Sequence, residues 1–228
     1  MLIQIPNLLE PDVLKNVNQL LDSAGTAWVD GRVTAGHQGA SVKLNQQIEE
    51  QSEIAFKCQN MIASALERNP LFISAALPKT LYPPMFNRYA KGMAFGPHVD
   101  GGIRLHPHTG EKLRTDLSMT IFLSDPNSYE GGELEIEDTY GKHLVKMPAG
   151  DMVLYPSSSL HQVLPVTKGV RQACFTWVQS MIRSDEDRRI LYGLDRAVQQ
   201  LIATDADDQA MRMLMGTYHN LLRKWGEI

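Results

Sequence analysis

The central part of the chain, residues 81–182, changes from helical to extended periodicity, and this change most constrains the fold. Short alternating runs are separated there by glycine, proline, asparagine and aspartate, which is typical of strands joined by tight turns. The expected strands are MFNRYA (85–90), DLSMTIFL (116–123), GELEIED (132–138), KHLVKM (142–147), DMVLYP (151–156), HQVLPV (161–166) and RQACFTWVQSMI (171–182). This spacing predicts a sandwich or a double-sheet jelly roll.

Helical periodicity flanks this block on both sides. The expected helices are PDVLKNVNQLLDSA (11–24), QQIEEQSEIAFKCQNMIASALERN (46–69), SDEDRRILYGLDRAVQQLIA (184–203) and the segment from 207 onward. The pattern predicts a mainly β fold with flanking helices: an N-terminal helical or mixed region (1–80) packed on the core, the β core (81–182) and a C-terminal helical extension (183–228). The last two helices are amphipathic, so we expect them to pack on each other, on the core or across a homo-oligomer interface.

Charge and cysteine usage exclude several classes of partner. The 228 residues carry a net charge of −4, and the sequence pI is about 6.0. A chain without a basic field is unsuited to nucleic acid or to an anionic membrane surface. The N-terminal MLIQIPNLLEPDVL lacks the pattern of a signal peptide, and no apolar run is long enough to span a membrane. Cys58 and Cys174 are predicted to be buried thiols, and we expect a cytoplasmic protein.

The stretch GPHVDGG (96–102) places His98 and Asp100 two residues apart. In an extended chain such residues face the same side, so both side chains can reach one small object. Alone, the pattern also fits a surface histidine beside a solvated aspartate. His161, at the start of another expected strand, supplies a second imidazole. Two histidines and one carboxylate are the facial ligand set that leaves open coordination positions on iron(II).

Arg171 lies ten residues after His161, at the start of the last expected strand. An arginine that points into a barrel needs an anionic partner, and the segment 162–177 contains no acid. Two partners are open at this point. One is a bound carboxylate, and the other is an ion pair with an acid from another strand, such as Glu133 or Asp151.

Four segments of the sequence together resemble parts of a known protein family. They are RYAKGMAFGPHVDGG (88–102), EGGELEIED (130–138), AGDMVLYPSSSLHQVLPVTKGVRQACFTWVQS (149–180) and the helical tail. In these segments the chain resembles the PKHD-type hydroxylases, bacterial members of the iron(II)- and 2-oxoglutarate-dependent dioxygenases related to prolyl 4-hydroxylases. The resemblance covers nearly the whole chain and includes the order of H-x-D, distal histidine and arginine.

The resemblance implies a double-stranded β-helix core over residues 81–182. It further implies iron(II) on His98, Asp100 and His161, and the 5-carboxylate of 2-oxoglutarate on Arg171. The family reaction uses dioxygen and couples oxidative decarboxylation of 2-oxoglutarate, to succinate and CO2, with hydroxylation of a primary substrate. That substrate is not identified by the sequence. The family also implies L-ascorbate.

Further cosubstrate contacts are implied on neighbouring strands. Tyr89 stands where related prolyl hydroxylases have a tyrosine that contacts 2-oxoglutarate. Some relatives use a second tyrosine on the next strand, where this chain has Phe122. Ser118 or Thr120 would then have to assist in holding the carboxylate.

Two other functional classes are open on the ligand residues alone. One is a cupin-like hydrolase or isomerase with zinc or manganese, since the ligand types do not exclude those metals. The other is a non-catalytic metal-dependent binding module. Arg171 discriminates between these classes and the dioxygenase, because neither alternative needs a fixed anchor for a carboxylate.

The segment GGIRLHPHTGEKLRT (101–115) follows the H-x-D pair, and its glycines and proline predict a long loop at the mouth of the barrel. Its basic residues are Arg104, Lys112 and Arg114. One interpretation is a solvated surface loop. The other is a lid that closes over the iron and favours an anionic or carbonyl-rich substrate. No metal role is expected for the remaining histidines, His37, His106, His108, His143 and His219.

Overall fold

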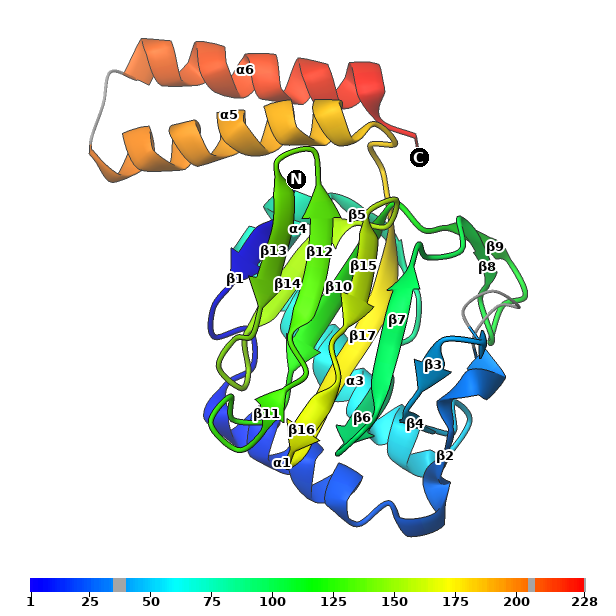
Figure 1. The fold of residues 1–228 in the computed structure, drawn as a ribbon. Helices are drawn as coiled ribbons and strands as arrows, with labels where there is room; N and C mark the ends of the chain where they lie inside the picture. Colours follow the sequence, from blue (N-terminus) through cyan, green and yellow to red (C-terminus); the bar gives the residue numbers. More distant parts are fainter. Residues whose placement is uncertain (35–39, 205–207, 228) are drawn as a thin grey trace.

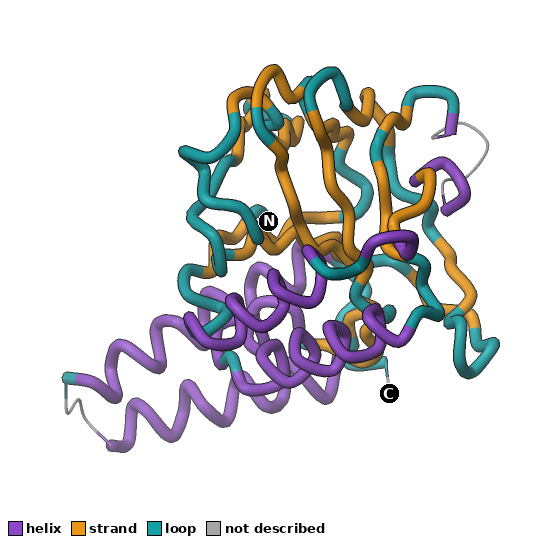
Figure 2. Tube along the Cα trace, turned by 90° about the horizontal axis from the view of Figure 1, so that it is seen from below, coloured by secondary structure: helices purple, strands orange, loops and turns teal. Residues whose placement is uncertain are grey.

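The computed structural model describes residues 1–34, 40–204 and 208–227. Two β-sheets face each other across an interior, helices cover the outer side of the larger sheet, and a helical hairpin lies at one end (Figure 1). Figure 2 shows the same layers from below, with the helices beneath the sheets and the hairpin extending away from the body. This arrangement confirms the expected jelly roll with flanking helices.

The larger sheet has eight strands in the described residues, and all its pairings are antiparallel. Their order is β1 (Ile3–Ile5), β14 (Met152–Pro156), β10 (Leu117–Phe122), β17 (Val170–Ser180), β6 (Met85–Ala90), β4 (Gln46–Ile48) and β2 (Trp28–Asp30), with β5 (Pro78–Leu81) paired to β17. Three strands from the first 50 residues therefore extend a sheet whose centre comes from the expected β block.

The smaller sheet has five described strands, in the order β13 (Gly141–Val145), β12 (Leu134–Asp138), β15 (Leu160–Val163), β7 (Ala94–His98) and β3 (Lys43–Leu44). Two short ladders lie beside it, β11 (Glu130–Gly131) with β16 (Val166–Lys168), and β8 (Ile103–Leu105) with β9 (Lys112–Arg114). The hairpin expected around Gly141 is confirmed as β12 and β13, with Asp138 opposite Gly141.

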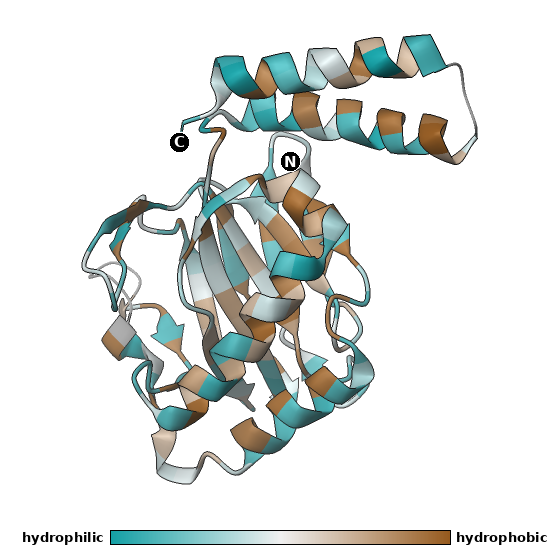
Figure 3. Ribbon diagram, turned by 180° about the vertical axis from the view of Figure 1, so that it is seen from behind, coloured by the Kyte–Doolittle hydropathy of each residue, from teal (hydrophilic) through white to brown (hydrophobic). Residues whose placement is uncertain are grey.

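Helices α1 (Pro11–Asp22), α3 (Glu53–Arg68) and α4 (Pro70–Ala76) cover the outer face of the larger sheet. Figure 3 shows them from behind, lying across that sheet. Strand β10 shows how the two faces divide. Leu117, Met119 and Ile121 pack into the helix-covered core, while Phe122 belongs to a second core between the sheets. Because side chains alternate along a strand, Ser118 and Thr120 share the inner face with Phe122.

The helix expected over residues 46–69 begins only at Glu53, where the Ser52 hydroxyl accepts a hydrogen bond from the amide of Ala55. Residues 46–48 form strand β4 instead, so this part of the prediction is wrong. The apolar Ile48 fits helical spacing, but β4 pairs with both β2 and β6. Pairing on both sides satisfies its backbone and outweighs the local helical signal.

The segment 101–115 is also more ordered than predicted, because it contains the β8–β9 hairpin rather than a continuous loop. Leu113 explains the order. Its side chain is buried with Tyr82, Met85 and Trp177. At the base of the hairpin, the amide of Thr115 donates to the carbonyl of Gly102.

The C-terminal helices α5 (Asp185–Ala203) and α6 (Asp208–Trp225) pack as an antiparallel hairpin, as predicted (Figure 1). Tyr218, Leu221, Leu222 and Trp225 of α6 pack against a small core that includes Leu191 of α5. Among the described residues, no helix has both the length and the apolar composition needed to cross a bilayer. Both cysteines are buried and unpaired, as expected.

Candidate metal centre

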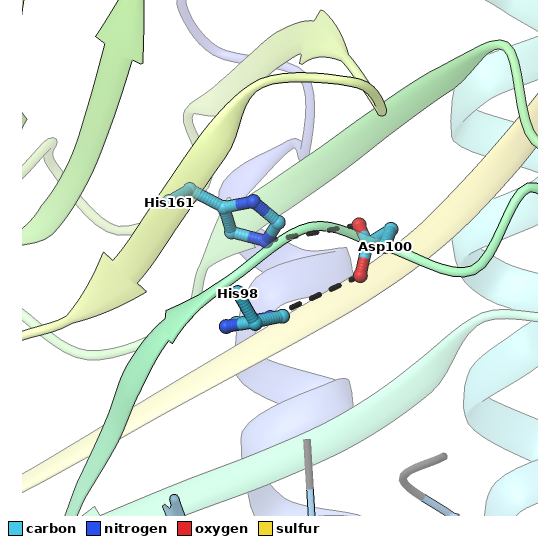
Figure 4. A group of neighbouring side chains, drawn as sticks. All are labelled: His98, Asp100 and His161. Carbon is cyan, nitrogen blue, oxygen red and sulfur yellow. Dashed lines mark ion pairs between the residues drawn. The ribbon is translucent and has the colours of Figure 1, made fainter. Parts of the chain in front are cut away.

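The two histidines of the predicted ligand set are direct neighbours in the smaller sheet. His98 is the last residue of β7, and its Cα pairs with that of His161 on β15. Asp100 follows two residues after β7 ends. One nitrogen of each histidine and one oxygen of Asp100 lie within 4.8 Å of one another. Figure 4 shows both rings on the same side of the carboxylate, each facing one of its two oxygens.

Backbone carbonyls fix the orientation of both rings. Nδ1 of His98 lies 2.8 Å from the carbonyl oxygen of Gly96, and Nδ1 of His161 lies 3.0 Å from that of Ser159. Because a carbonyl only accepts hydrogen bonds, each Nδ1 carries a proton and each Nε2 presents a lone pair. These Nε2 atoms lie 3.9 Å and 3.7 Å from the oxygens of Asp100. Such outer hydrogen bonds are typical of histidines that bind metals.

The surroundings of His98 keep its ring neutral. Burial and the neighbouring His161 lower the pKa of His98 to about 4. The ring is stacked on Phe95, with 3.6 Å between the ring centroids. A neutral imidazole is the form that binds a metal ion, so this ring is held ready for ligation at neutral pH.

Asp100 is oriented by Ser118, which in turn contacts Ser157. The Ser118 hydroxyl donates to Oδ2 of Asp100 at 2.6 Å and lies 2.8 Å from the hydroxyl of Ser157. Ser118, which the sequence suggested as a cosubstrate contact, therefore lies directly against the carboxylate. Ser157 was missed by the sequence analysis, although it stands in the PSSSLH segment just before His161.

The donor set fits a first-row divalent metal ion. Two imidazole nitrogens and one carboxylate oxygen converge from one side, and each donor has an outer hydrogen bond that holds it in place. Protein ligands on one face leave the opposite coordination positions open for small molecules, as in the iron(II) oxygenases. No other group of three or more possible ligand residues is found in the described part of the chain.

A cavity of about 650 Å³ opens beside the three residues. This volume is within the range of roughly 300 to 1,000 Å³ usual for small-molecule sites. Strands of both sheets line it. Its polar and charged lining residues are Lys43, Gln47, Asn87, Tyr89, His98, Asp100, Arg104, Ser118, Thr120, Tyr155, His161 and Thr176.

Arg171 is buried between the sheets, with 1% of its surface exposed. Its guanidinium lies 5.4 Å from the ring centroids of both Tyr89 and Phe122. In the described residues Nε has no hydrogen-bond partner, and no acid lies within ion-pair distance. The alternative of an ion pair with Glu133 or Asp151 is therefore wrong. Asp151 instead accepts a hydrogen bond from the backbone of Asn7.

Gly132 makes room for this arginine. A Cβ atom at that position would lie 3.1 Å from Cδ of Arg171 and 2.9 Å from a methyl group of Val166. The φ angle of +68° adds a second reason for glycine. The guanidinium itself is not among the groups that line the cavity. It lies behind the ring of Tyr89, which does line it.

Two tyrosines line the cavity together with the metal-binding residues, and both also neighbour Arg171. Tyr89 pairs with Arg171 across β6 and β17, and burial raises the pKa of Tyr89 to about 12. Tyr155 on β14 was missed by the sequence analysis. Its ring centroid lies 5.2 Å from that of His161. Burial raises the pKa of Tyr155 well above its usual value, Asp100 adds to this rise and Arg171 opposes it.

Lys43 was also missed, because it lies in the N-terminal region outside the expected β block. Strand β3 brings it beside β7, where its Cα pairs with that of Phe95. Of the basic residues in the predicted loop, only Arg104 lines the cavity. Arg114 instead forms ion pairs with Asp116 and Glu227.

The other described histidines are not part of this group of possible ligands. Exposed His143 forms an ion pair with Asp138, and exposed His219 lies against Tyr218. His106 and His108 contact each other in the β8–β9 hairpin. His37 lies outside the described residues.

Comparisons with known proteins find similarity over the whole length of the chain. The model of the 2OG-Fe(II) oxygenase superfamily matches residues 84–179, and that of the PKHD-type hydroxylase C-terminal domain matches residues 185–227. A PKHD-type hydroxylase of Cupriavidus metallidurans is 63% identical over 227 residues, covering 100% of both chains.

Two solved structures share the fold. One is a Pseudomonas putida prolyl-4-hydroxylase, 19% identical, which covers 78% of this chain and 92% of its own with a TM-score of 0.53. The other is a Trichoplax adhaerens prolyl hydroxylase, solved with a peptide fragment of the hypoxia inducible factor oxygen degradation domain. It is 16% identical and covers 83% of this chain and 86% of its own, with a TM-score of 0.57.

Proposed function

Because the chain belongs to the PKHD-type hydroxylases, which are 2OG-Fe(II) oxygenases, we propose that His98, Asp100 and His161 hold its iron(II). Arg171 binds the distal carboxylate of 2-oxoglutarate in this proposal. The main support for this assignment is geometric. The Nε2 atoms of His98 and His161 both face the carboxylate of Asp100, and all three residues lie beside a cavity. Family membership also favours an oxygenase over the cupin-like hydrolase, isomerase or binding-module alternatives.

When bound, iron(II) supplies the oxidative chemistry, in which dioxygen and 2-oxoglutarate are consumed and a C–H bond is hydroxylated. The protein's own groups hold, orient and shield the reactants. Ser118, which in turn contacts Ser157, holds the carboxylate of Asp100 in position. Tyr89 and Tyr155 belong to the apolar part of the cavity wall, where they limit the access of water.

The unpaired guanidinium supports the assignment of Arg171. A buried charge without a partner costs several kcal/mol, so such residues are usually paired. A carboxylate supplied by 2-oxoglutarate would satisfy it with two parallel hydrogen bonds. Because Tyr89 lies between the guanidinium and the cavity, we propose that its ring or the guanidinium shifts when 2-oxoglutarate binds. Thr120, on the same inner face, is the better candidate than Ser118 for a further contact, since Ser118 is already bonded to Asp100.

The reaction can be tested without a known primary substrate. Purified protein reconstituted with iron(II) is expected to convert 2-oxoglutarate to succinate slowly, because in the proposed reaction the cosubstrate is oxidised at the metal and the primary substrate is only the acceptor of the oxygen atom. Zinc or manganese in place of iron(II) is expected to give none, since neither supplies the oxidative step. Succinate would be quantified by mass spectrometry, with boiled protein as the control. Succinate formation that does not depend on iron and dioxygen would contradict the proposal.

The remaining features of the family extend the proposal. L-ascorbate would act as a reductant for the iron, and a cytoplasmic location is supported by two buried free thiols. A division into residues 1–80, 81–182 and 183–228 describes the N-terminal region, the catalytic core and the helical extension. The identity of the primary substrate is a separate question, to which the cavity charges below are relevant.

The C-terminal hairpin is proposed to join two copies of the chain. Helix α6 contains no buried residue, and Met213 is 68% exposed. Ile190 and Ile202 of α5 are exposed as well. Large exposed apolar side chains on two adjacent helices favour an interaction surface. The occupant we propose is the same hairpin of a second copy, because homo-oligomers are the commonest assemblies.

If two copies associate through this hairpin, the average molecular mass measured by sedimentation equilibrium should rise with protein concentration. Replacing Met213 and Ile202 together with glutamate is expected to shift the protein towards the monomer, because buried like charges oppose association. The exposed Leu144 of β13 offers a matched control outside the two helices, as Leu144→Glu should leave the mass unchanged. A wild-type monomer at every concentration would exclude the interface.

A further inference from the structure

Two cations share the cavity with the metal-binding residues. Of the side chains that line it, the formally charged ones are Lys43, Asp100 and Arg104. Lys43 comes from β3 of the smaller sheet and is 6% exposed. Arg104 comes from β8 of the hairpin that follows Asp100. The fold therefore places two cations, from two separate strands, in the same cavity.

Aromatic rings hold both cations in place. The Lys43 ammonium lies 5.1 Å from the ring centroid of Phe95, the residue stacked on His98. The Arg104 guanidinium lies 4.0 Å from the ring centroid of Trp177 and 4.8 Å from that of Tyr82. Cation–π contacts restrict both side chains, and the guanidinium of Arg104 keeps a donor available for another partner, because its Nε has no hydrogen bond among the described residues.

Arg104 lacks an anionic partner. Its Nε is buried without a hydrogen bond, and it forms no ion pair with any described residue. The two cations are also close enough to repel. Burial, and then the charge of Arg104, lower the pKa of Lys43 to about 8, while carboxylates including Asp100 oppose this effect. Neighbouring like charges in a cavity are unfavourable unless an anion joins them.

Asp100 does not neutralise this pair once the enzyme is loaded. In the proposed function the carboxylate of Asp100 binds iron(II), and 2-oxoglutarate is a dianion whose distal carboxylate binds Arg171. The positive charges are then those of Lys43, Arg104 and Arg171 and the two of iron(II). The negative charges are those of Asp100 and the two of 2-oxoglutarate. Among these groups the positive charges outnumber the negative ones, so the cavity side that carries Lys43 and Arg104 should attract an anion.

We propose that Lys43 and Arg104 bind an anionic group of the primary substrate, a carboxylate or a phosphate, and thereby position that substrate beside the metal. This inference rests on the proposed function and adds the chemical class of the substrate to it. Because Lys43 is buried inside the cavity, the anionic group must enter it, which favours a small molecule. Arg104 provides a planar fork suited to two oxygens of one anionic group, and Lys43 adds a point charge.

The test measures binding rather than turnover. The protein would be loaded with manganese(II), which does not drive the reaction, and saturated with N-oxalylglycine, an unreactive analogue of 2-oxoglutarate. Three pools of capped amino acids are then titrated by calorimetry: N-acetyl acids with a free carboxylate, the matching neutral amides, and amides that carry a phosphate ester. We expect one or both anionic pools to bind and the neutral amides not to bind. The two anionic pools distinguish a carboxylate from a phosphate.

Variants assign the binding to the two cations. Arg104→Gln and Lys43→Met are each expected to weaken binding of the anionic pool by about 10-fold or more, because each removes one charged partner. Arg104→Lys should recover only part of the affinity. Lys112→Gln removes the same charge from the same hairpin, on an exposed side chain outside the cavity, and should bind like the wild type. Melting temperatures show that each variant is folded.

The outcomes separate this inference from the proposed function. If N-oxalylglycine does not bind the wild type, the proposed function fails. If it binds but no anionic pool binds, or if the amides bind equally well, the assignment of an anionic substrate is overturned and the function stands. Unchanged affinity in folded Arg104→Gln and Lys43→Met would also overturn it.

Discussion

Replacing Asp100 with alanine is expected to abolish the conversion of 2-oxoglutarate to succinate and to strip iron from the purified protein. The carboxylate is the only anionic member of the ligand set, and both Nε2 atoms face it. Loss of an outer partner of a ligand typically costs about 10- to 100-fold in affinity or activity, so loss of a ligand should exceed 100-fold. Iron content by atomic absorption and succinate by mass spectrometry would measure the two effects.

Two controls make this result specific. Asp138→Ala removes an exposed aspartate of β12 and should change neither quantity. Ser118→Ala leaves the ligand but removes the hydrogen bond to its oxygen, so a loss within the 10- to 100-fold range is expected. The Asp100 variant should remain folded, because the two hydrophobic cores lie outside the triad. Normal iron content and turnover in Asp100→Ala would refute the assignment.

Replacing Arg171 should affect 2-oxoglutarate rather than iron. Arg171→Met removes the charge, and we expect the KM for 2-oxoglutarate to rise about 30-fold or more, since leaving one member of a buried charge pair alone costs about 2–5 kcal/mol. Arg171→Lys should also raise the KM, because an ammonium cannot form the same parallel hydrogen bonds. Iron content should stay near that of the wild type in both variants. An unaltered KM would remove Arg171 from the cosubstrate site.

Protein stability provides an independent readout for Arg171. Without ligands its guanidinium is buried and has no ion pair in the described residues, so Arg171→Met should leave the free energy of unfolding unchanged or raise it. Arg188 is the matched control. It is equally buried, but it donates to the carbonyls of Ile182 and Arg183 and to Asp185. Arg188→Met should therefore destabilise the protein by about 1–3 kcal/mol, because buried carbonyls lose their partners. The KM for 2-oxoglutarate should not change.

The sequence predicted the parts of the site that depend on residue type and local spacing. His98 and Asp100 were recognisable because a two-residue spacing in an extended segment puts both on one face. His161 and Arg171 followed because each begins an expected strand of the same block. The structure brings the first three together and buries the fourth between the sheets. Their roles in binding iron and 2-oxoglutarate stay predictions that the variants above test.

Other parts of the site depend on long-range pairing, which a local pattern does not reveal. Lys43 reaches the cavity only because β3 pairs with β7. Tyr155 was visible in an expected strand, but its closeness to His161 depends on how the two sheets face each other. The hydrogen bond from Ser118 to Asp100 likewise joins β10 to the end of β7. The sequence did contain one signal for these residues. Side chains alternate between the two faces of a strand, and this alternation puts Ser118 of β10 and Tyr155 of β14 on the inner face.

The errors in secondary structure have the same origin. Residues 46–48 were assigned to a helix from the spacing of Ile48, whereas two neighbouring strands determine their conformation. The segment 101–115 was assigned to a loop from its glycines and proline. The contact of Leu113 with Tyr82 and Trp177, which stabilises the β8–β9 hairpin, is distant in sequence.

The pairing of His98 with His161 across β7 and β15 also determines when metal can enter the protein. These strands are distant in the chain, so their imidazoles meet only after the smaller sheet has formed. A nascent or unfolded chain has no chelating site of this geometry, in contrast to zinc fingers, in which metal drives folding. On the proposed assignment, iron would therefore bind only after the smaller sheet has formed, and metallation would follow folding. During iron scarcity the protein would accumulate as a folded apoprotein, which a later influx of iron could activate without new synthesis.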